Sequence, residues 1–281
     1  MTSSTVQSTA MQESKRLDRD NMSVLIAILL LGNLLFRFIE LPEQRWRFRV
    51  LGSPLDLNLT GVELLVVLMV GLVCTGTNLI LHGRAQQETR PIYISWILPG
   101  IVAGLFTFAL SRVALLPVWI AGLCLMGFVI AATIVSEYRA ASLDAPSYPG
   151  ARLTLNVLAY FLAFALFAMV YQARARSIIS ATATMLTAVL LSLDLLSVAD
   201  APLARVLLLA GVVGLIVGES TWALNYWQVN SWIGGVLLLL VFYVATNLAY
   251  QHLLGKLTLL TIVEFAAVAF VVFVVVLLVN P

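Results

Sequence analysis

Long apolar segments alternate with short polar breaks along almost the whole chain after residue 22. A helix that spans a bilayer needs about twenty mostly apolar residues. The charged and turn-rich breaks separate nine such segments, and weaker breaks would also allow seven or eight. The pattern therefore predicts an all-α, polytopic transmembrane bundle of about nine spans. The segments are Ser23–Ile39, Leu59–Leu81, Ile92–Ser111, Leu115–Ser136, Leu153–Tyr171, Ile178–Val198, Leu203–Leu224, Trp232–Tyr250 and Leu257–Val279.

A different periodicity appears between the first two segments. Arg45, Arg47 and Arg49 alternate with Trp46 and Phe48, and a second alternating arm follows a Gly-Ser-Pro sequence. Alternation with period two around a turn is typical of a β-hairpin, which we expect within residues 44–60. On the membrane surface its rings would lie in the interface and its arginines would face headgroups or water. The alternative is a lid, or a strand on which a partner docks.

The polar residues 1–22 do not have the pattern of a cleavable signal peptide, so we expect a retained N-terminal tail. Residues 23–281 are expected to form a single transmembrane domain, because no loop is long enough for an independent soluble domain. Any activity must then come from the bundle and its short connections. Basic residues divide almost evenly between the two sides of the predicted bundle, which favours a cytoplasmic N-terminus only slightly.

Composition supports a membrane protein. Hydrophobic residues make up 61% of the chain and charged residues 11%, whereas roughly a quarter of the residues in soluble domains are charged. The net charge of +2 is not concentrated in a basic run, so nucleic acid is not an expected partner. The expected surroundings are the lipid bilayer and other membrane subunits.

The most informative polar stretch is Gly218–Trp227, which follows the apolar run Val206–Val217. An ionisable side chain such as Glu219 is costly within a bilayer and usually has a partner or a function there. Helical spacing puts Trp222 and Tyr226 on the same face as Glu219. Asn225 lies on the adjacent face, paired with a threonine one turn before it.

Two interpretations of this face remain open. In the structural one, Glu219 is protonated or hydrogen-bonded to neighbouring helices, and the aromatic residues belong to an interfacial belt. In the functional one, Glu219 lines a cavity and binds a cation or relays protons, with Asn225 and Tyr226 supplying hydrogen bonds. Asp194 and Glu264 are further intramembrane candidates for such a site, and the sequence leaves open whether they share a cavity with Glu219.

Two pairs of glycines four residues apart predict close helix packing within the chain. They are Gly100 with Gly104 and Gly214 with Gly218, and each pair lies on one helix face where a neighbouring backbone can approach. Because Glu219 directly follows the second pair, we expect close helix contact around its carboxylate.

Motifs for catalysis and cofactor binding are missing. The sequence contains no phosphate-binding glycine loop, no zinc-protease signature and no nucleophile elbow. Cys74 and Cys124 lie in separate apolar segments, and His82 and His252 each stand alone at a segment end. We therefore predict no metal site and no cofactor, and an enzyme is the least favoured class.

Several stretches resemble an uncharacterised family of bacterial multi-pass membrane proteins. The resemblance implies a helical membrane fold and a bacterial inner (cytoplasmic) membrane, and it transfers no catalytic residues. It rests on Gly214–Trp227, Gly234-Gly235, Phe242-Tyr243, Gln251–Leu257 with Glu264 beyond, Leu51–Pro54 and Tyr171–Thr182.

Three functional hypotheses follow. The first is a transporter-like or small-ligand- or ion-binding bundle that uses the intramembrane carboxylate Glu219. The second is a structural or assembly subunit of a larger membrane complex. The third is a lipid-modifying membrane enzyme, which would require Glu219 and His252 to meet at a common interfacial cavity.

Overall fold

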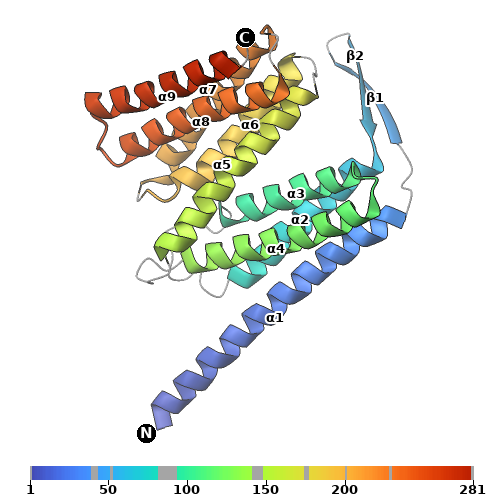
Figure 1. The fold of residues 1–281 in the computed structure, drawn as a ribbon. Coiled ribbons are helices and arrows are strands. Elements are labelled where there is room, and N and C mark those ends of the chain that lie inside the picture. The colour runs from blue at the N-terminus through green and yellow to red at the C-terminus, as the bar shows by residue number, and fades with distance from the viewer. Residues whose placement is uncertain are drawn as a thin grey trace. The chain divides into compact units, whose positions relative to one another are not determined.

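The computed structural model describes the backbone of residues 2–38, 44–50, 53–81, 94–140, 148–173, 177–199, 201–227 and 230–279. Helices account for most of this part of the chain (Figure 1). They are α1 (Thr2–Phe38), α2 (Gly61–Leu81), α3 (Ile97–Ser111), α4 (Leu116–Ala140), α5 (Tyr148–Gln172), α6 (Ser177–Leu196), α7 (Leu203–Asn225), α8 (Ser231–Leu253) and α9 (Leu259–Val279), with a short 3-10 helix, η2 (Ile94–Trp96), before α3.

Within the described residues, eight helical segments are long and apolar enough to cross a membrane: residues 20–38 of α1, η2 together with α3, and each of α2 and α4 to α8. The chain is therefore a multi-pass membrane protein. Each of these helices overlaps one of the predicted segments, and α9 coincides with the ninth. At the start, α1 begins at Thr2 and therefore also includes the residues predicted as a polar tail, whereas the part of α1 apolar enough to span a membrane is Asp20–Phe38.

A two-stranded antiparallel hairpin connects α1 and α2. Its strands, β1 (Gln44–Val50) and β2 (Ser53–Leu59), lie within the range predicted for the hairpin. The register places Trp46 opposite Leu57, Arg47 opposite Asp56 and Phe48 opposite Leu55. The side chains of both strands lie outside the described part of the structure, so an interfacial role for Arg45, Trp46, Arg47, Phe48 and Arg49 stays a prediction.

The chain divides into two compact units: unit 1 comprises residues 1–88 and 98–148, and unit 2 comprises residues 89–97 and 149–281. In unit 1, α1 packs against α2 and α4. The predicted close approach at Gly100 and Gly104 is present, because a Cβ atom on either glycine would lie only 3.1 Å from a side-chain atom of Cys74 or Val70 on α2.

Arg37 fixes the end of α1 to the turn between α3 and α4. Its Nη1 donates to the carbonyl oxygen of Val113 at 2.8 Å, and its Nη2 donates to that of Ala114 at 2.9 Å. The guanidinium also lies over the ring of Trp119, with Cζ 5.2 Å from the centroid. These bonds satisfy carbonyls that follow the end of α3 and have no partner within a helix.

Glu63 belongs to the N-terminal cap of α2. The backbone N–H of Thr60 donates to its Oε2 at 3.1 Å, which is the reciprocal bond of a capping box. A structural role for this carboxylate agrees with its position in the first turn, where the helix dipole favours an anion.

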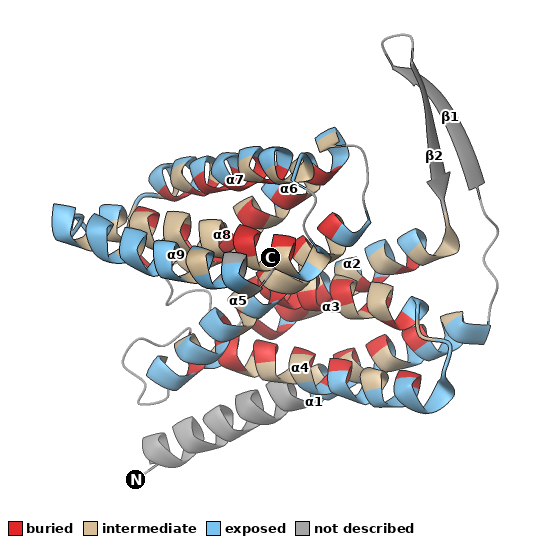
Figure 2. Ribbon diagram, turned by 45° about the horizontal axis from the view of Figure 1, so that its top comes forward, coloured by how far each residue is buried: buried red, intermediate tan, exposed pale blue. Residues whose placement is uncertain are grey.

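In unit 2, α6 and α7 form the most extensive helix pair, and α8 packs against α7 and α9. The second glycine pair lies in the α6–α7 contact: a Cβ atom on Gly214 would lie 2.9 Å from the carbonyl oxygen of Met185, and one on Gly218 would lie 3.3 Å from that of Ala181. Figure 2 shows that α6 and α7 each have a buried side and an exposed side.

Candidate functional site

The side of α7 that faces α6 carries a set of hydrogen-bonded polar side chains. Thr221 is fully buried and its hydroxyl lies 2.8 Å from that of Thr184. One turn further along, Asn225 Nδ2 donates to Ser180 Oγ at 2.9 Å. We call Ser180, Thr184, Thr221 and Asn225 the polar seam. Its side chains bond one another between two helices, which is the common use of small polar residues in membrane bundles.

Tyr171, near the C-terminal end of α5, lies beside the C-terminal end of α7, close to the Asn225 end of the polar seam. Its hydroxyl lies 3.0 Å from the carbonyl oxygen of Leu224 and 2.8 Å from that of Trp227. The last carbonyls of a helix have no partner within that helix, so Tyr171 serves the C-terminal end of α7. Its ring also packs against Gly234 at the start of α8, where a Cβ atom would lie 2.8 Å from the ring.

Glu219, Trp222 and Tyr226 lie on the opposite, exposed side of α7. Trp222 is 56% exposed and Tyr226 is 77% exposed, so the shared face predicted from their spacing is present. The expectation of close helix contact around the carboxylate is wrong. Gly218 lies in the contact with α6. Because each residue of an α-helix is rotated about 100° from the one before, the next residue, Glu219, is turned away from that contact.

For a bilayer centred on α7, the position of Glu219 along the helix corresponds to a depth inside the hydrocarbon region. It lies six residues before the last residue of the helix, Asn225, or about 9 Å along the axis. The 23 residues of α7 span about 35 Å, slightly more than a hydrocarbon core of about 30 Å. No hydrogen bond or ion pair joins Glu219 to another residue in the described part of the chain. Trp222 and Tyr226 lie closer to the helix end, as interfacial aromatic residues do.

The other two candidate carboxylates lie elsewhere. Asp194 is 1% exposed near the C-terminal end of α6, ten residues and therefore about 15 Å beyond Thr184, which is level with Thr221 and Glu219. Glu264 is exposed on α9, a helix that packs against α8. Among the described residues, no three His, Cys, Asp or Glu side chains come together as a metal site would need.

His252 is exposed in the last turn of α8. Because α7 and α8 are antiparallel neighbours joined by a short turn, the C-terminal end of α8 lies far from that of α7. Counting residues from this turn puts His252 about 20 Å further along the helix axes than Glu219. The two side chains therefore do not share an interfacial cavity. His82 lies outside the described residues.

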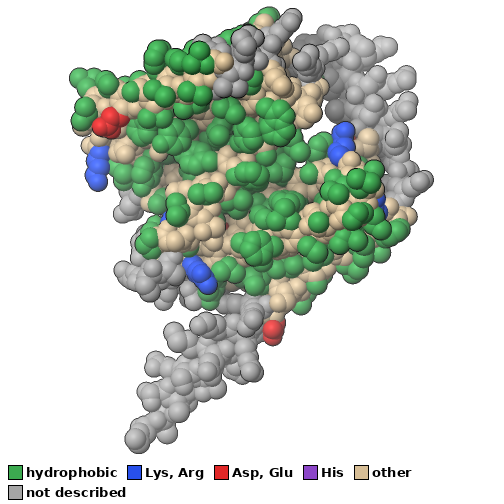
Figure 3. Space-filling model, in the orientation of Figure 1, with side chains coloured by type: hydrophobic (Ala, Val, Ile, Leu, Met, Phe, Trp, Pro, Cys, Tyr) green, Lys and Arg blue, Asp and Glu red, His purple; other side chains and the backbone are tan. Residues whose placement is uncertain are grey.

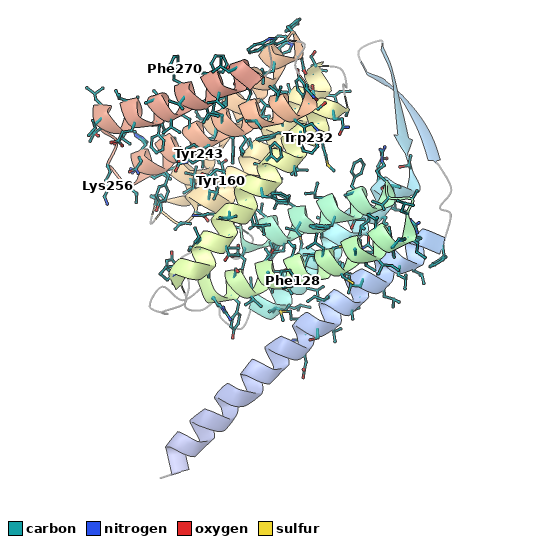
Figure 4. All side chains as sticks on the ribbon, viewed as in Figure 1. Phe128, Tyr160, Trp232, Tyr243, Lys256 and Phe270 are labelled. Atoms are coloured by element: carbon teal, nitrogen blue, oxygen red, sulfur yellow. The ribbon has the colours of Figure 1, made fainter. Side chains whose placement is uncertain are left out.

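A second polar contact within unit 2 joins α5 to α8. Asn247 Nδ2 donates to the hydroxyl of Tyr160 at 3.0 Å and to the carbonyl oxygen of Tyr243 at 2.8 Å. The rings of Tyr160 and Tyr243 lie side by side, with centroids 5.6 Å apart and planes tilted by 57° (Figure 4). Tyr160, Asn247, Tyr171 and the α6 half of the polar seam were not predicted as site residues. The sequence signal for the polar seam is the matching four-residue spacing of Ser180 with Thr184 and of Thr221 with Asn225.

Residues 42–279 match a family model described as "Protein of unknown function (DUF5656)". The chain belongs to the DUF5656 family. The match extends from just before β1 through α9 and confirms the resemblance to an uncharacterised family. No curated protein and no solved structure matches the chain. Membership of DUF5656 assigns no activity, so a functional proposal depends on the geometry of the site.

Proposed function

We propose that the protein is a structural or assembly subunit of a larger membrane complex and that it contacts its partner through the exposed side of α7. The observation that carries this proposal is the exposed position of Glu219 on α7, six residues before the end of a helix long enough to cross a bilayer. A carboxylate facing lipid is costly. A neighbouring membrane protein on this side of α7 would remove that cost.

The inward side of α7 supports the same proposal. Thr221 and Asn225 already bond to α6, and Gly214 and Gly218 pack closely against it. A transport pathway that uses Glu219 would require the carboxylate to face a cavity between helices, and Glu219 points to the other side. The distance between Glu219 and His252 likewise gives no support to a lipid-modifying enzyme.

We place this subunit in a bacterial inner membrane. Helical spans support that location, because integral proteins of the bacterial outer membrane are closed β-barrels. On the face drawn in Figure 3, hydrophobic side chains predominate and few charged side chains are visible, as a bilayer requires. Fractionation of cells that express a tagged chain, with marker proteins for each membrane, tests the location.

The test of the proposed function is the mass of the particle that the protein forms in its own membrane. We expect native mass spectrometry of the tagged full-length protein, extracted with its surrounding lipid, to show a particle heavier than one chain. Replacing Glu219 with Lys should reduce the heavier species. Glu264→Lys is the matched control, since Glu264 is also exposed but lies on α9. A wild-type protein found only as a single chain would contradict the proposal.

A further inference from the structure

We infer that the partner presents to Glu219 a transmembrane helix carrying one lysine or arginine at the same depth. This inference rests on the proposed function and specifies the chemistry of the partner. The exposed carboxylate, the shape of the surface around it and the positions of the protein's own basic residues carry the argument.

The surface beside Glu219 is shaped to receive a helix. Gly211, Leu215, Glu219 and Ala223 follow one another at intervals of four, so they form a single ridge along α7. Leu215 is 50% exposed and Ala223 is also exposed. A Cβ atom built on Gly211 would meet nothing within 4 Å. Small residues at both ends of the ridge allow another helix to approach the backbone closely.

The charge of Glu219 selects the occupant of this ridge. An apolar helix packed over Glu219 would leave the carboxylate without a hydrogen-bond donor, and the cost of desolvation would remain. A lysine or arginine on the facing helix would pair with the carboxylate and donate hydrogen bonds to it. Charged groups within membranes are commonly paired in this way. Trp222 and Tyr226, nearer the helix end, would flank the contact at the interface.

The basic side chains that the structure describes do not provide that charge from a second copy of this chain. Two copies related by a twofold axis along the membrane normal would place equal depths opposite each other, so that Glu219 would meet Glu219. The lysines and arginines whose side chains the structure describes lie in turns or within four residues of a helix end, whereas Glu219 lies six residues from one. They are Arg37, Arg112, Arg139, Arg152, Arg205 and Lys256.

Synthetic helices test the inference directly. The full-length protein is reconstituted in liposomes with a fluorescence acceptor on an N-terminal tag. The probes are two donor-labelled transmembrane peptides of leucine and alanine, one with a single Lys six residues from its C-terminal end and one without it. We expect the Lys peptide to bind the wild-type protein at least tenfold more tightly than the apolar peptide. Glu219→Gln should abolish the difference, and Glu264→Gln should preserve it.

A charge exchange provides the second arm. Glu219→Lys should lose the preference for the Lys peptide and gain one for a peptide with Glu at the same position. Circular dichroism verifies that each variant keeps its helix content. Equal binding of both peptides to the wild-type protein, or loss of the preference in Glu264→Gln, would overturn the inference. If the native particle is heavier than one chain and depends on Glu219 while the peptides bind equally, the assembly proposal survives and the basic partner is rejected. A single-chain particle with a clear Lys preference would reject assembly alone.

Discussion

At the scale of single residues, Tyr171 connects three helices through one side chain. Its hydroxyl reaches two carbonyls at the end of α7, and its ring covers Gly234 at the start of α8. Both carbonyls lie at the end of α7, where the regular hydrogen bonds of the helix stop, so Tyr171 supplies a donor to them. We expect Tyr171 to stabilise the packing of α5, α7 and α8.

Replacing Tyr171 with Phe tests this contribution. The ring and its contact with Gly234 remain, and the donor to the carbonyls of Leu224 and Trp227 is lost. We expect the free energy of unfolding to fall by about 1 kcal/mol, as for other hydrogen bonds between membrane helices. Unfolding in mixed micelles measures the change. Tyr226→Phe is the control and should change stability by less than about 0.5 kcal/mol, because Tyr226 is exposed. Equal effects of the two changes would contradict the role of Tyr171.

The sequence predicts that Glu219, Trp222 and Tyr226 share a face of α7, because helical spacing alone determines this. It does not predict which way the face points. Leucine and valine residues of α7 occur on all sides of the helix. Lipid tails and a protein interior both accommodate these apolar side chains. Periodicity therefore does not distinguish a lipid-facing side from a packed side. The α6 half of the polar seam was not predicted, since its pairing with Thr221 and Asn225 depends on the alignment of α6 with α7.

At the scale of helices, the contact between α6 and α7 depends on Gly214. A Cβ atom there would lie 2.9 Å from the carbonyl oxygen of Met185 and would also meet the Val189 side chain. We expect Gly214→Ala to separate the helices and lower the free energy of unfolding by about 1 to 3 kcal/mol. Gly211→Ala lies on the open side of the same helix and should be neutral or slightly stabilising, since alanine favours helix more than glycine. Thermal unfolding of the two variants measures the contrast, and a destabilised Gly211→Ala with an unchanged Gly214→Ala would refute it.

The end of α8 is a second feature at this scale. Gly255 has φ of +66°, its N–H donates to the carbonyl oxygen of His252, and the N–H of Lys256 donates to that of Gln251. Together these bonds form a Schellman cap, in which glycine avoids the strain of a left-handed conformation.

Gly255→Ala should therefore destabilise the protein by about 1 kcal/mol. Gly255→Asn should be tolerated better, because asparagine adopts the left-handed conformation more readily. Hydrogen exchange at the last turn of α8 locates the effect. Faster exchange confined to other helices would argue against this origin.

The spans themselves follow closely from the sequence, because bilayer thickness dictates how many apolar residues a helix must contain. The ends of helices follow less closely. Residues 2–22 contain no glycine or proline, so nothing in their backbone chemistry stops a helix before the first span, and α1 extends through them. The polar composition of these residues predicts a tail outside the first span, and it does not predict whether the backbone of that tail is helical.

At the scale of the whole molecule, the succession of helices predicts the sides on which the turns lie. Four helices, α4 to α7, separate Ala114 from Asn230, so both turns should face the same side of the membrane. Thr258, one helix further, should face the other. Single cysteines at these positions are introduced into a protein with Cys74 and Cys124 replaced by serine. In sealed vesicles, a membrane-impermeant maleimide should label Ala114→Cys and Asn230→Cys from the same side and Thr258→Cys from the other. Labelling of Ala114→Cys and Asn230→Cys from opposite sides would disprove the spanning order.

The clamp between Arg37 and the α3–α4 turn has a consequence for the order of events during synthesis. Arg37 donates to the carbonyl of Ala114, 77 residues later in the chain. At about 5 to 20 residues per second, the ribosome needs roughly 4 to 15 s to reach that acceptor after it has made Arg37. During this interval the end of the first span lacks these two hydrogen bonds. The end of α1 therefore gains these two hydrogen bonds only after two further helices, α2 and α3, have been synthesised.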